Sequence, residues 1–259
     1  MPLHMNANTL TSPTNAGRLP CLALVLMLLP ALASAQTTPK TYSTEFTTVE
    51  NPISEGGAWG EGGLKTGLDW TNVRTNGSIA HGTQTGSDGY DDSIALLTGF
   101  GPDYRIDAVV HFVGSRSSST DSHEVELILR GSYGPRVQRI YECNLGYSGS
   151  SGWYAQIILL NGSIGTFESI GDTVAAVPNV RDGDVFSAEI RGNVINTYLN
   201  GVKLKTATNS VLTTGQPGIG FFWRGTEQIT DFGFKSLTVT ELGAAGPRRP
   251  NPPTNVQAR

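Results

Sequence analysis

Hydrophobic and polar residues alternate with a period of two along much of the chain, and turn residues separate the alternating runs. The clearest run spans residues 185–206, VFSAEIRGNVINTYLNGVKLKT. Asn200-Gly201 is typical of a two-residue hairpin, because both turn positions need a positive φ. Gly192-Asn193 can serve in the same way one strand earlier. The pattern therefore predicts three antiparallel strands in a meander.

Two-residue turns also predict the register of this meander. Because side chains alternate between the two faces, a fixed register decides which residues point inward together. The predicted pairs are Leu199 with Val202, Thr197 with Leu204, Ile190 with Ile195, and Phe186 with Leu199. The predicted inward face carries Phe186, Ala188, Ile190, Ile195, Thr197, Leu199, Val202 and Leu204.

Similar alternation elsewhere predicts further strands, and no segment after the first 35 residues has a convincing helical period. These strands cover residues 104–112, 124–130, 139–145, 153–160, 219–223 and 232–240. Many strands without helices indicate a sandwich or a barrel, and strands of this length in a large domain favour two broad sheets. We therefore expect an all-β, two-sheet antiparallel sandwich over residues 36–242.

The two ends of the chain differ from the middle. Arg18, an apolar run over residues 21–32 and the triplet Ala33-Ser34-Ala35 are typical of a secretory signal peptide over residues 1–35. The run is shorter than the roughly 20 residues of a membrane span, and no later segment is apolar enough to be one. Residues 243–259 read as a Pro-rich linker or tail. A secreted protein, extracellular or periplasmic, is expected.

Composition narrows the range of partners. Charged residues make up 15% of the chain, against about 25% in typical soluble domains. A net charge of -4 gives no reason to expect nucleic acid or an anionic membrane as partner. Cys143 is the one cysteine left after the signal peptide, so no disulfide forms within the mature chain. Its alternating strand predicts a buried, inert thiol.

The meander and its flanks carry a family resemblance. The segments are AEIRGNVINTYLNGVKLKTAT (188–208), TTGQPGIGFFW (213–223), ITDFGFKSLTVTEL (229–242) and STEFTTVENPISEGGAW (43–59). They resemble the concanavalin A-like lectin/glucanase superfamily, particularly its laminin-G-like and keto-glycoside-hydrolase-like bacterial branches. The resemblance implies a jelly-roll sandwich whose first strand pairs with its last. The superfamily holds lectins, glycan-binding modules, glycoside hydrolases and polysaccharide lyases, so the fold does not choose among them.

Glu124 and Glu126 are the candidate catalytic residues. Two positions apart on a strand, they share a face with Cα atoms about 6.5–7 Å apart. Retaining glycosidases need two carboxyl groups about 5 Å apart. The resembling glucanases place a third acid between such residues, however, and Val125 stands there, so that pattern is broken. Ligand binding and ion pairs with Arg130, Arg139 or Arg105 are the alternatives.

Polar and aromatic residues also cluster on the two strands that follow. Glu142 and Asn144 share one face of their strand, and Tyr154 and Gln156 share one face of the next. Trp223 and Arg224 end a further strand. Their side chains could form the wall of a groove, or Arg224 could stack on Trp223 as a structural cation–π pair. Convergent polar and aromatic groups are typical of a binding site, although core packing is the alternative. The expected ligand-binding residues are Glu124, Glu126, Arg130, Glu142, Tyr154, Gln156, Trp223 and Arg224.

No zinc-like spacing of His and Cys occurs, and no organic cofactor is expected. The resemblance implies a structural Ca²⁺ near the first and last strands, with Glu45 and Asp231 as candidate ligands. Asp88, Asp91 and Asp92 offer clustered oxygen atoms, although Asp is also a common turn residue.

Three functions remain open. The leading interpretation is a secreted carbohydrate-binding domain with its ligand across one sheet. The second is a glycoside hydrolase or polysaccharide lyase on the same sheet; a lyase would combine His111, Tyr154, Arg130 and Gln156. The third is a structural or adhesive extracellular module. Neither the glycan nor the oligomeric state follows from the sequence.

Overall fold

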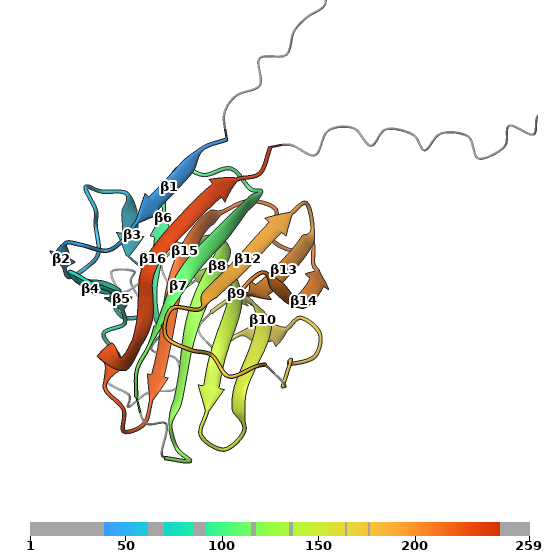
Figure 1. Cartoon of the computed structure of the whole chain (residues 1–259). Helices are drawn as coiled ribbons and strands as arrows, with labels where there is room; N and C mark the ends of the chain where they lie inside the picture. The colour runs from blue at the N-terminus through green and yellow to red at the C-terminus, as the bar shows by residue number, and fades with distance from the viewer. Residues whose placement is uncertain are drawn as a thin grey trace, which may run out of the picture. The chain divides into compact units, whose positions relative to one another are not determined.

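The computed structural model describes residues 39–61, 70–84, 92–114, 118–134, 137–163, 165–175 and 177–243. The predicted signal peptide and residues 244–259 of the tail lie outside these ranges. Within them the chain forms two antiparallel sheets, and the single 3₁₀ turn Ile229–Asp231 is the one helical element. Figure 1 shows β7, β12 and β16 of one sheet in front of β8, β9 and β15 of the other. The predicted all-β, two-sheet antiparallel sandwich is confirmed.

The first sheet has nine strands among the described residues, and the meander forms one end of it. Short β1 and long β16 pair antiparallel, so the expected pairing of the first and last strands is confirmed. The spatial order is β14 (Val202–Thr208), β13 (Val194–Leu199), β12 (Val185–Arg191), β7 (Tyr104–Phe112), β16 (Phe232–Glu241), β5 (Ala80–His81), β4 (Arg74–Asn76) and β2 (Val49–Glu50), with β1 (Thr41–Thr44) beside β16.

The second sheet has seven strands in the described part of the chain, and three long neighbours form its centre. Its order is β11 (Phe167–Ser169), β10 (Gly152–Gly162), β9 (Val137–Ser148), β8 (Ser122–Gly134), β15 (Gln216–Arg224), β6 (Ser93–Leu97) and β3 (Trp59–Glu61).

Alternation along the strands builds the core between the two sheets. On β7, alternate residues from Tyr104 to Phe112 are buried while the residues between them are only partly buried, as predicted. Val125 and Leu127 of β8 pack into the same core as Phe186 of β12. Cys143 is buried there with a free thiol, and burial raises its pKa. Residues on the opposite side of β8 must therefore face away from the nine-stranded sheet.

The predicted register of the meander is correct for three pairs and wrong for one. Phe186 pairs with Leu199, Ile190 with Ile195, and Leu199 with Val202. A β-bulge at Thr197/Tyr198 shifts the pairing, so Thr197 lies opposite Lys205 rather than Leu204. One extra residue reverses which side chains point inward.

The inward face of β14 changes in consequence. Val202 is 68% exposed and Leu204 is only partly buried, whereas Lys205 and Ala207 are buried. The Lys205 ammonium group donates a hydrogen bond to the Asp172 carbonyl oxygen, so its aliphatic stem packs inward while its charge is satisfied.

Candidate functional site

The outer face of the seven-stranded sheet is the face turned away from the nine-stranded sheet. Strand pairing sets its residues in rows that cross β15, β8, β9 and β10. Glu124 lies beside Phe222 and Gly146, and Gly146 lies beside Tyr154. A second row contains Gly220, Glu126, Asn144 and Gln156. A third row contains Gly218, Ile128, Glu142 and Ile158.

Two glycines in these rows make space for the polar groups. A Cβ on Gly146 would lie 2.3 Å from Cζ of Tyr154, so the tyrosine ring crosses β9 where no side chain blocks it. A Cβ on Gly220 would lie 2.1 Å from Oε2 of Glu126, so that carboxyl group occupies the space over β15. Both positions require glycine because a neighbouring side chain fills the place of the Cβ.

Glu124 is the best-satisfied acid of the site. The Tyr154 hydroxyl donates a hydrogen bond to its Oε1. The Asn144 amide donates from Nδ2 to its Oε2 at 3.0 Å. Burial raises the pKa of Glu124, and these two hydrogen bonds act in the opposite direction because they favour the carboxylate.

Glu126 and Glu142 are in a less favourable environment. Burial raises the pKa of Glu126 well above its usual range, and the charges of Glu142, Asp92 and Glu124 raise it further. Burial also raises the pKa of Glu142 well above its usual range, followed by the charges of Asp92 and Glu124, while the Asn144 side chain partly offsets this. One oxygen from each of the three glutamates lies within 4.8 Å of the others.

A cavity of about 400 Å³ opens over this cluster. Carboxyl, amide and phenol groups line its floor, and aliphatic and aromatic side chains form its walls. Its lining residues are Asp92, Ser122, Glu124, Glu142, Asn144, Tyr154, Ile158, Leu160, Phe167 and Phe222. Phe167 is 56% exposed, so its ring is accessible from solvent at the cavity. Glu126 does not line the cavity and is 0% exposed, so it lies behind the other two glutamates.

An apolar patch continues the outer face beyond the cavity. Ile128 and Ile140 are both 0% exposed although they lie on the side opposite the main core. The patch is a second hydrophobic cluster made of Trp70, Ile94, Leu96, Ile128, Ile140 and Leu160. The polar cavity therefore adjoins a buried apolar cluster on one side, and Leu160 belongs to both.

Of the predicted ligand-binding residues, the structure brings Glu124, Glu126, Glu142 and Tyr154 together. Gln156 lies on the same face beside them, where its amide donates to the Thr173 hydroxyl at 2.7 Å. Trp223 faces the other way: it pairs with His123 and packs against the main core. Exposed Arg224 stands at the end of β15 and does not line the cavity.

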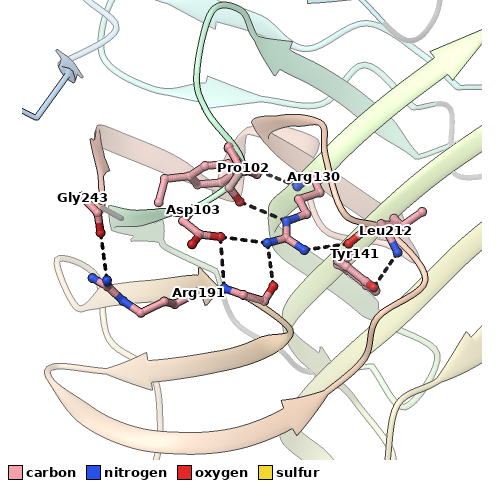
Figure 2. Close-up of polar contacts among 9 residues, drawn as sticks. Pro102, Asp103, Arg130, Tyr141, Arg191, Leu212 and Gly243 are labelled. Carbon is pink, nitrogen blue, oxygen red and sulfur yellow. Dashed lines mark hydrogen bonds and ion pairs between the residues drawn. The ribbon is translucent and has the colours of Figure 1, made fainter. Parts of the chain in front are cut away.

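Arg130 is also directed away from the cavity. Its guanidinium group donates to the carbonyl oxygens of Pro102 at 3.0 Å, Leu212 at 2.7 Å and Gly192 at 2.6 Å, and to the Asp103 carboxylate at 2.9 Å. Figure 2 shows the Arg130 guanidinium group joining the segments that contain Pro102, Leu212 and Gly192. A bulge between Leu129 and Ser132 and a φ of 49° at Arg130 interrupt the alternation that would place it beside Glu126.

The ion pairs expected for Glu124 and Glu126 do not occur among the described residues. Arg130 pairs with Asp103, and Arg105 pairs with Asp107 at 2.8 Å. Arg139 is exposed on β9 and takes part in no ion pair within the described ranges. The residues suggested for a lyase are not gathered either, because His111 pairs with Asp182 on the nine-stranded sheet.

The predicted calcium ligands Glu45 and Asp231 lie outside the acidic cluster of the cavity. No group of three His, Cys, Asp or Glu side chains within the described ranges includes either of them. Asp231 instead accepts a hydrogen bond from the backbone N–H of Gln228 at 3.1 Å. Asp88 and Asp91 lie outside the described residues, whereas Asp92 lines the cavity.

Several lining residues were not among the predicted ligand-binding residues, and three of them offer a charged or aromatic group. Phe222 directly precedes the predicted Trp223 on β15. Assigning alternate residues of β15 to the correct faces would have placed Phe222, and not Trp223, on the face of Glu124. Phe167 lies on a three-residue edge strand that is too short to show alternation. Asp92 immediately precedes β6, where turn formation was the simpler interpretation.

No protein-family model matches the chain, and no curated protein matches it significantly. A solved structure described with the endo-acting O-glycanases of prominent members of the human gut microbiota aligns at 10% identity and a TM-score of 0.50, covering 78% of this chain and 98% of the other. The carbohydrate-binding module CBM66 from Bacillus subtilis aligns at 15% identity and a TM-score of 0.47, covering 73% and 95%. A glycoside hydrolase family 16 endo-glucanase from Bacteroides ovatus aligns at 11% identity and a TM-score of 0.47, covering 76% of this chain and 99% of the other.

At these identities the similarity concerns the fold. The chain has the concanavalin A-like jelly-roll fold that its sequence predicted. The structures named above give no support to the laminin-G-like detail of that prediction. No helix of the described residues is long and apolar enough to cross a membrane.

Proposed function

We propose that the chain binds a carbohydrate in the cavity on the outer face of the seven-stranded sheet. The observation that carries the proposal is the make-up of this cavity: carboxyl, amide and phenol groups lie between the aromatic rings of Phe222 and Phe167. Sugars stack their C–H faces on aromatic rings and exchange hydrogen bonds with planar polar groups. A volume of about 400 Å³ lies within the range of small-ligand sites.

The spacing of the two phenylalanines favours an oligosaccharide. Phe222 is on β15 and Phe167 on β11, and β8, β9 and β10 lie between them. Four strand spacings of about 4.8 Å separate β15 from β11 by about 19 Å across the sheet. The two residues are also offset along the strands, because Phe222 lies in the row of Tyr154 whereas Phe167 pairs with Leu160. A ligand that touches both rings is therefore longer than a single sugar ring. Because the floor is acidic, like-charge repulsion favours neutral over sulfated or uronic chains.

Titration calorimetry with neutral and acidic oligosaccharides of increasing length, mucin O-glycans included, tests this proposal. Phe167→Ala and Phe222→Ala should each weaken binding about three- to tenfold, because one aromatic contact contributes about 0.5–1.5 kcal/mol. Val211→Ala removes an exposed apolar side chain outside the cavity and is the matched control. Absence of binding to every sugar would refute the proposal and favour the adhesive-module interpretation, as would wild-type affinity in both phenylalanine variants.

Cleavage of a glycan is the second candidate, and the contrast between Glu124 and Glu142 favours it. Both line the cavity, and their nearest ligand oxygens are within the 4.8 Å of the cluster, close to the spacing of a retaining pair. Burial raises the pKa of Glu124 as well, but less than that of Glu142, because two hydrogen bonds favour its ionised form, which a nucleophile requires. Glu142 has a strongly raised pKa, because of burial and then the charges of Asp92 and Glu124, as a general acid requires.

Release of reducing ends from any bound oligosaccharide would identify an enzyme. In that case Glu124→Gln and Glu142→Gln should each abolish turnover while binding persists. Exposed Glu168→Gln on the neighbouring edge strand is the control and should leave turnover unchanged. Binding without release of reducing ends leaves the carbohydrate-binding function alone.

A further inference from the structure

The three glutamates of the cavity region present a dense group of acceptors. Glu126 of β8 lies directly opposite Asn144 of β9, and Glu142 is two residues before Asn144 on the same side of β9. Oxygens of Glu124, Glu126 and Glu142 lie within 4.8 Å of one another. None of the ion pairs in the described part of the chain includes any of these glutamates. Their negative charge is therefore not balanced by a described Lys, Arg or His side chain.

Two buried groups point to a missing ligand. Glu126 is 0% exposed, and neither of its carboxyl oxygens has a hydrogen-bond partner among the described residues. Asn144 is 1% exposed; its Nδ2 donates to Glu124, but its Oδ1 has no partner in the part of the chain that the structure describes. The amide oxygen of Asn144 is neutral, so its lack of a donor is independent of the acidic cluster. Buried acceptors without partners are rare in proteins, because each costs free energy unless something binds it.

We propose that Glu124, Glu126, Glu142 and Asn144 form a binding site for one Ca²⁺ ion. All the donors are oxygens, which suit a hard cation better than zinc or copper. Oxygens that share one Ca²⁺ lie at most about 5.2 Å apart, twice the longest usual Ca–O distance, and the oxygens of this cluster all lie within 4.8 Å of one another. Mg²⁺ needs a tighter octahedral shell at about 2.0–2.1 Å and usually keeps several waters, so it suits a cluster of protein oxygens less well.

The ion would be reached from the cavity. Glu124, Glu142 and Asn144 all line it, whereas Glu126 closes the site from behind. Ca²⁺ takes about six to eight ligands, so positions facing the cavity remain for water or for sugar hydroxyl groups. This last step rests on the proposed function, while the ion site itself does not. A bound Ca²⁺ would also keep Glu142 ionised, which excludes that residue as a general acid.

Calorimetric titration of the EDTA-treated, dialysed full chain with CaCl₂ tests the site without any sugar. The expected result is one Ca²⁺ per chain, with weaker binding of Mg²⁺ and a Ca²⁺-dependent rise in the unfolding temperature. Glu126→Gln keeps the shape of the side chain and should weaken Ca²⁺ binding at least about tenfold. Glu142→Gln is the second variant in case Glu126→Gln does not fold. Glu168→Gln, an exposed residue on β11, is the control.

The outcomes separate the two proposals. No Ca²⁺ binding at millimolar concentration by the wild type, or unchanged binding in a folded Glu126→Gln or Glu142→Gln variant, overturns the ion site. Glycan binding that is lost in EDTA and restored by CaCl₂ supports the ion site and its link to the sugar. Glycan binding without Ca²⁺ binding refutes only the ion site, and Ca²⁺ binding without glycan binding refutes only the carbohydrate proposal.

Discussion

Arg130 should be one of the most important polar residues for the stability of the fold. Arg130→Met removes the guanidinium group but keeps a long apolar stem and the same backbone strain at a φ of 49°. Four acceptors then lose a donor at once: three backbone carbonyl oxygens and the Asp103 carboxylate. These acceptors belong to the segment before β7, the β12–β13 turn and the loop before β15, so the loss affects both sheets (Figure 2).

The size of the effect follows from burial. The Arg130 side chain is 4% exposed and that of Asp103 is 23% exposed. Removing one partner of a buried ion pair costs about 3–5 kcal/mol. Asp103 recovers part of this, because water reaches it and it still accepts the Gly192 N–H at 3.1 Å. We therefore expect a loss of about 3–4 kcal/mol in the free energy of unfolding.

Urea unfolding followed by tryptophan fluorescence measures this loss. With an m-value of about 3 kcal/mol/M, the midpoint should fall by about 1 M. Arg105→Met is the matched control, because Arg105 is 29% exposed and pairs with Asp107 on its own strand. That exposed pair should contribute at most about 1 kcal/mol. Arg130→Lys keeps the charge but lacks the planar fork, so it should lose most of the stability that Arg130→Met loses.

Two results would refute this reasoning. A midpoint for Arg130→Met that equals the midpoint for Arg105→Met would show that the network contributes no more than a surface pair. Wild-type stability of Arg130→Lys would show that charge alone, and not the four-acceptor geometry, accounts for the effect.

Three further predictions concern the site, the pH dependence and the core. Gly146→Ala should displace the Tyr154 ring and cost about 1–3 kcal/mol of stability. Glycan affinity measured by calorimetry should fall, and an unchanged affinity would contradict this prediction. Hydrogen bonds, first of all the one from the Thr226 N–H, lower the pKa of Asp121 in the folded protein. The Asp121 carboxylate therefore stabilises the fold fully above its unfolded-state pKa of about 4. This stabilisation is lost as the pH falls through the lower pKa of the folded state. In urea unfolding, wild type should therefore exceed Asp121→Asn by a constant margin above about pH 4 and by a shrinking one below it; a margin independent of pH would exclude this explanation. Leu127→Ala, at a position 0% exposed, should cost about 2–5 kcal/mol in urea unfolding, against less than about 0.5 for exposed Val202→Ala; similar losses for both would contradict the assigned core.

Two errors of the sequence-based predictions share a physical cause. Alternation assigns a side chain to a face only while the strand is regular, and a single bulge reverses the assignment. The bulge at Thr197/Tyr198 turned Lys205 inward in place of Leu204. The irregularity after Leu129 likewise separated Arg130 from Glu126. The bulge between β13 and β14 has no turn residue or glycine that would mark it in the sequence. Gly131, however, lies at the irregularity of β8 and could have marked that one.

The sequence by itself determined the long strands, the hairpin turns and the buried side of most long strands, because these depend on neighbouring residues and on a period of two. It also placed Glu124 with Glu126, and Tyr154 with Gln156, on common faces. Only the tertiary structure decided that β8 lies between β15 and β9, which brings Glu142 and Phe222 to Glu124. That strand order depends on contacts between residues far apart in the chain, and local periodicity carries no information about them.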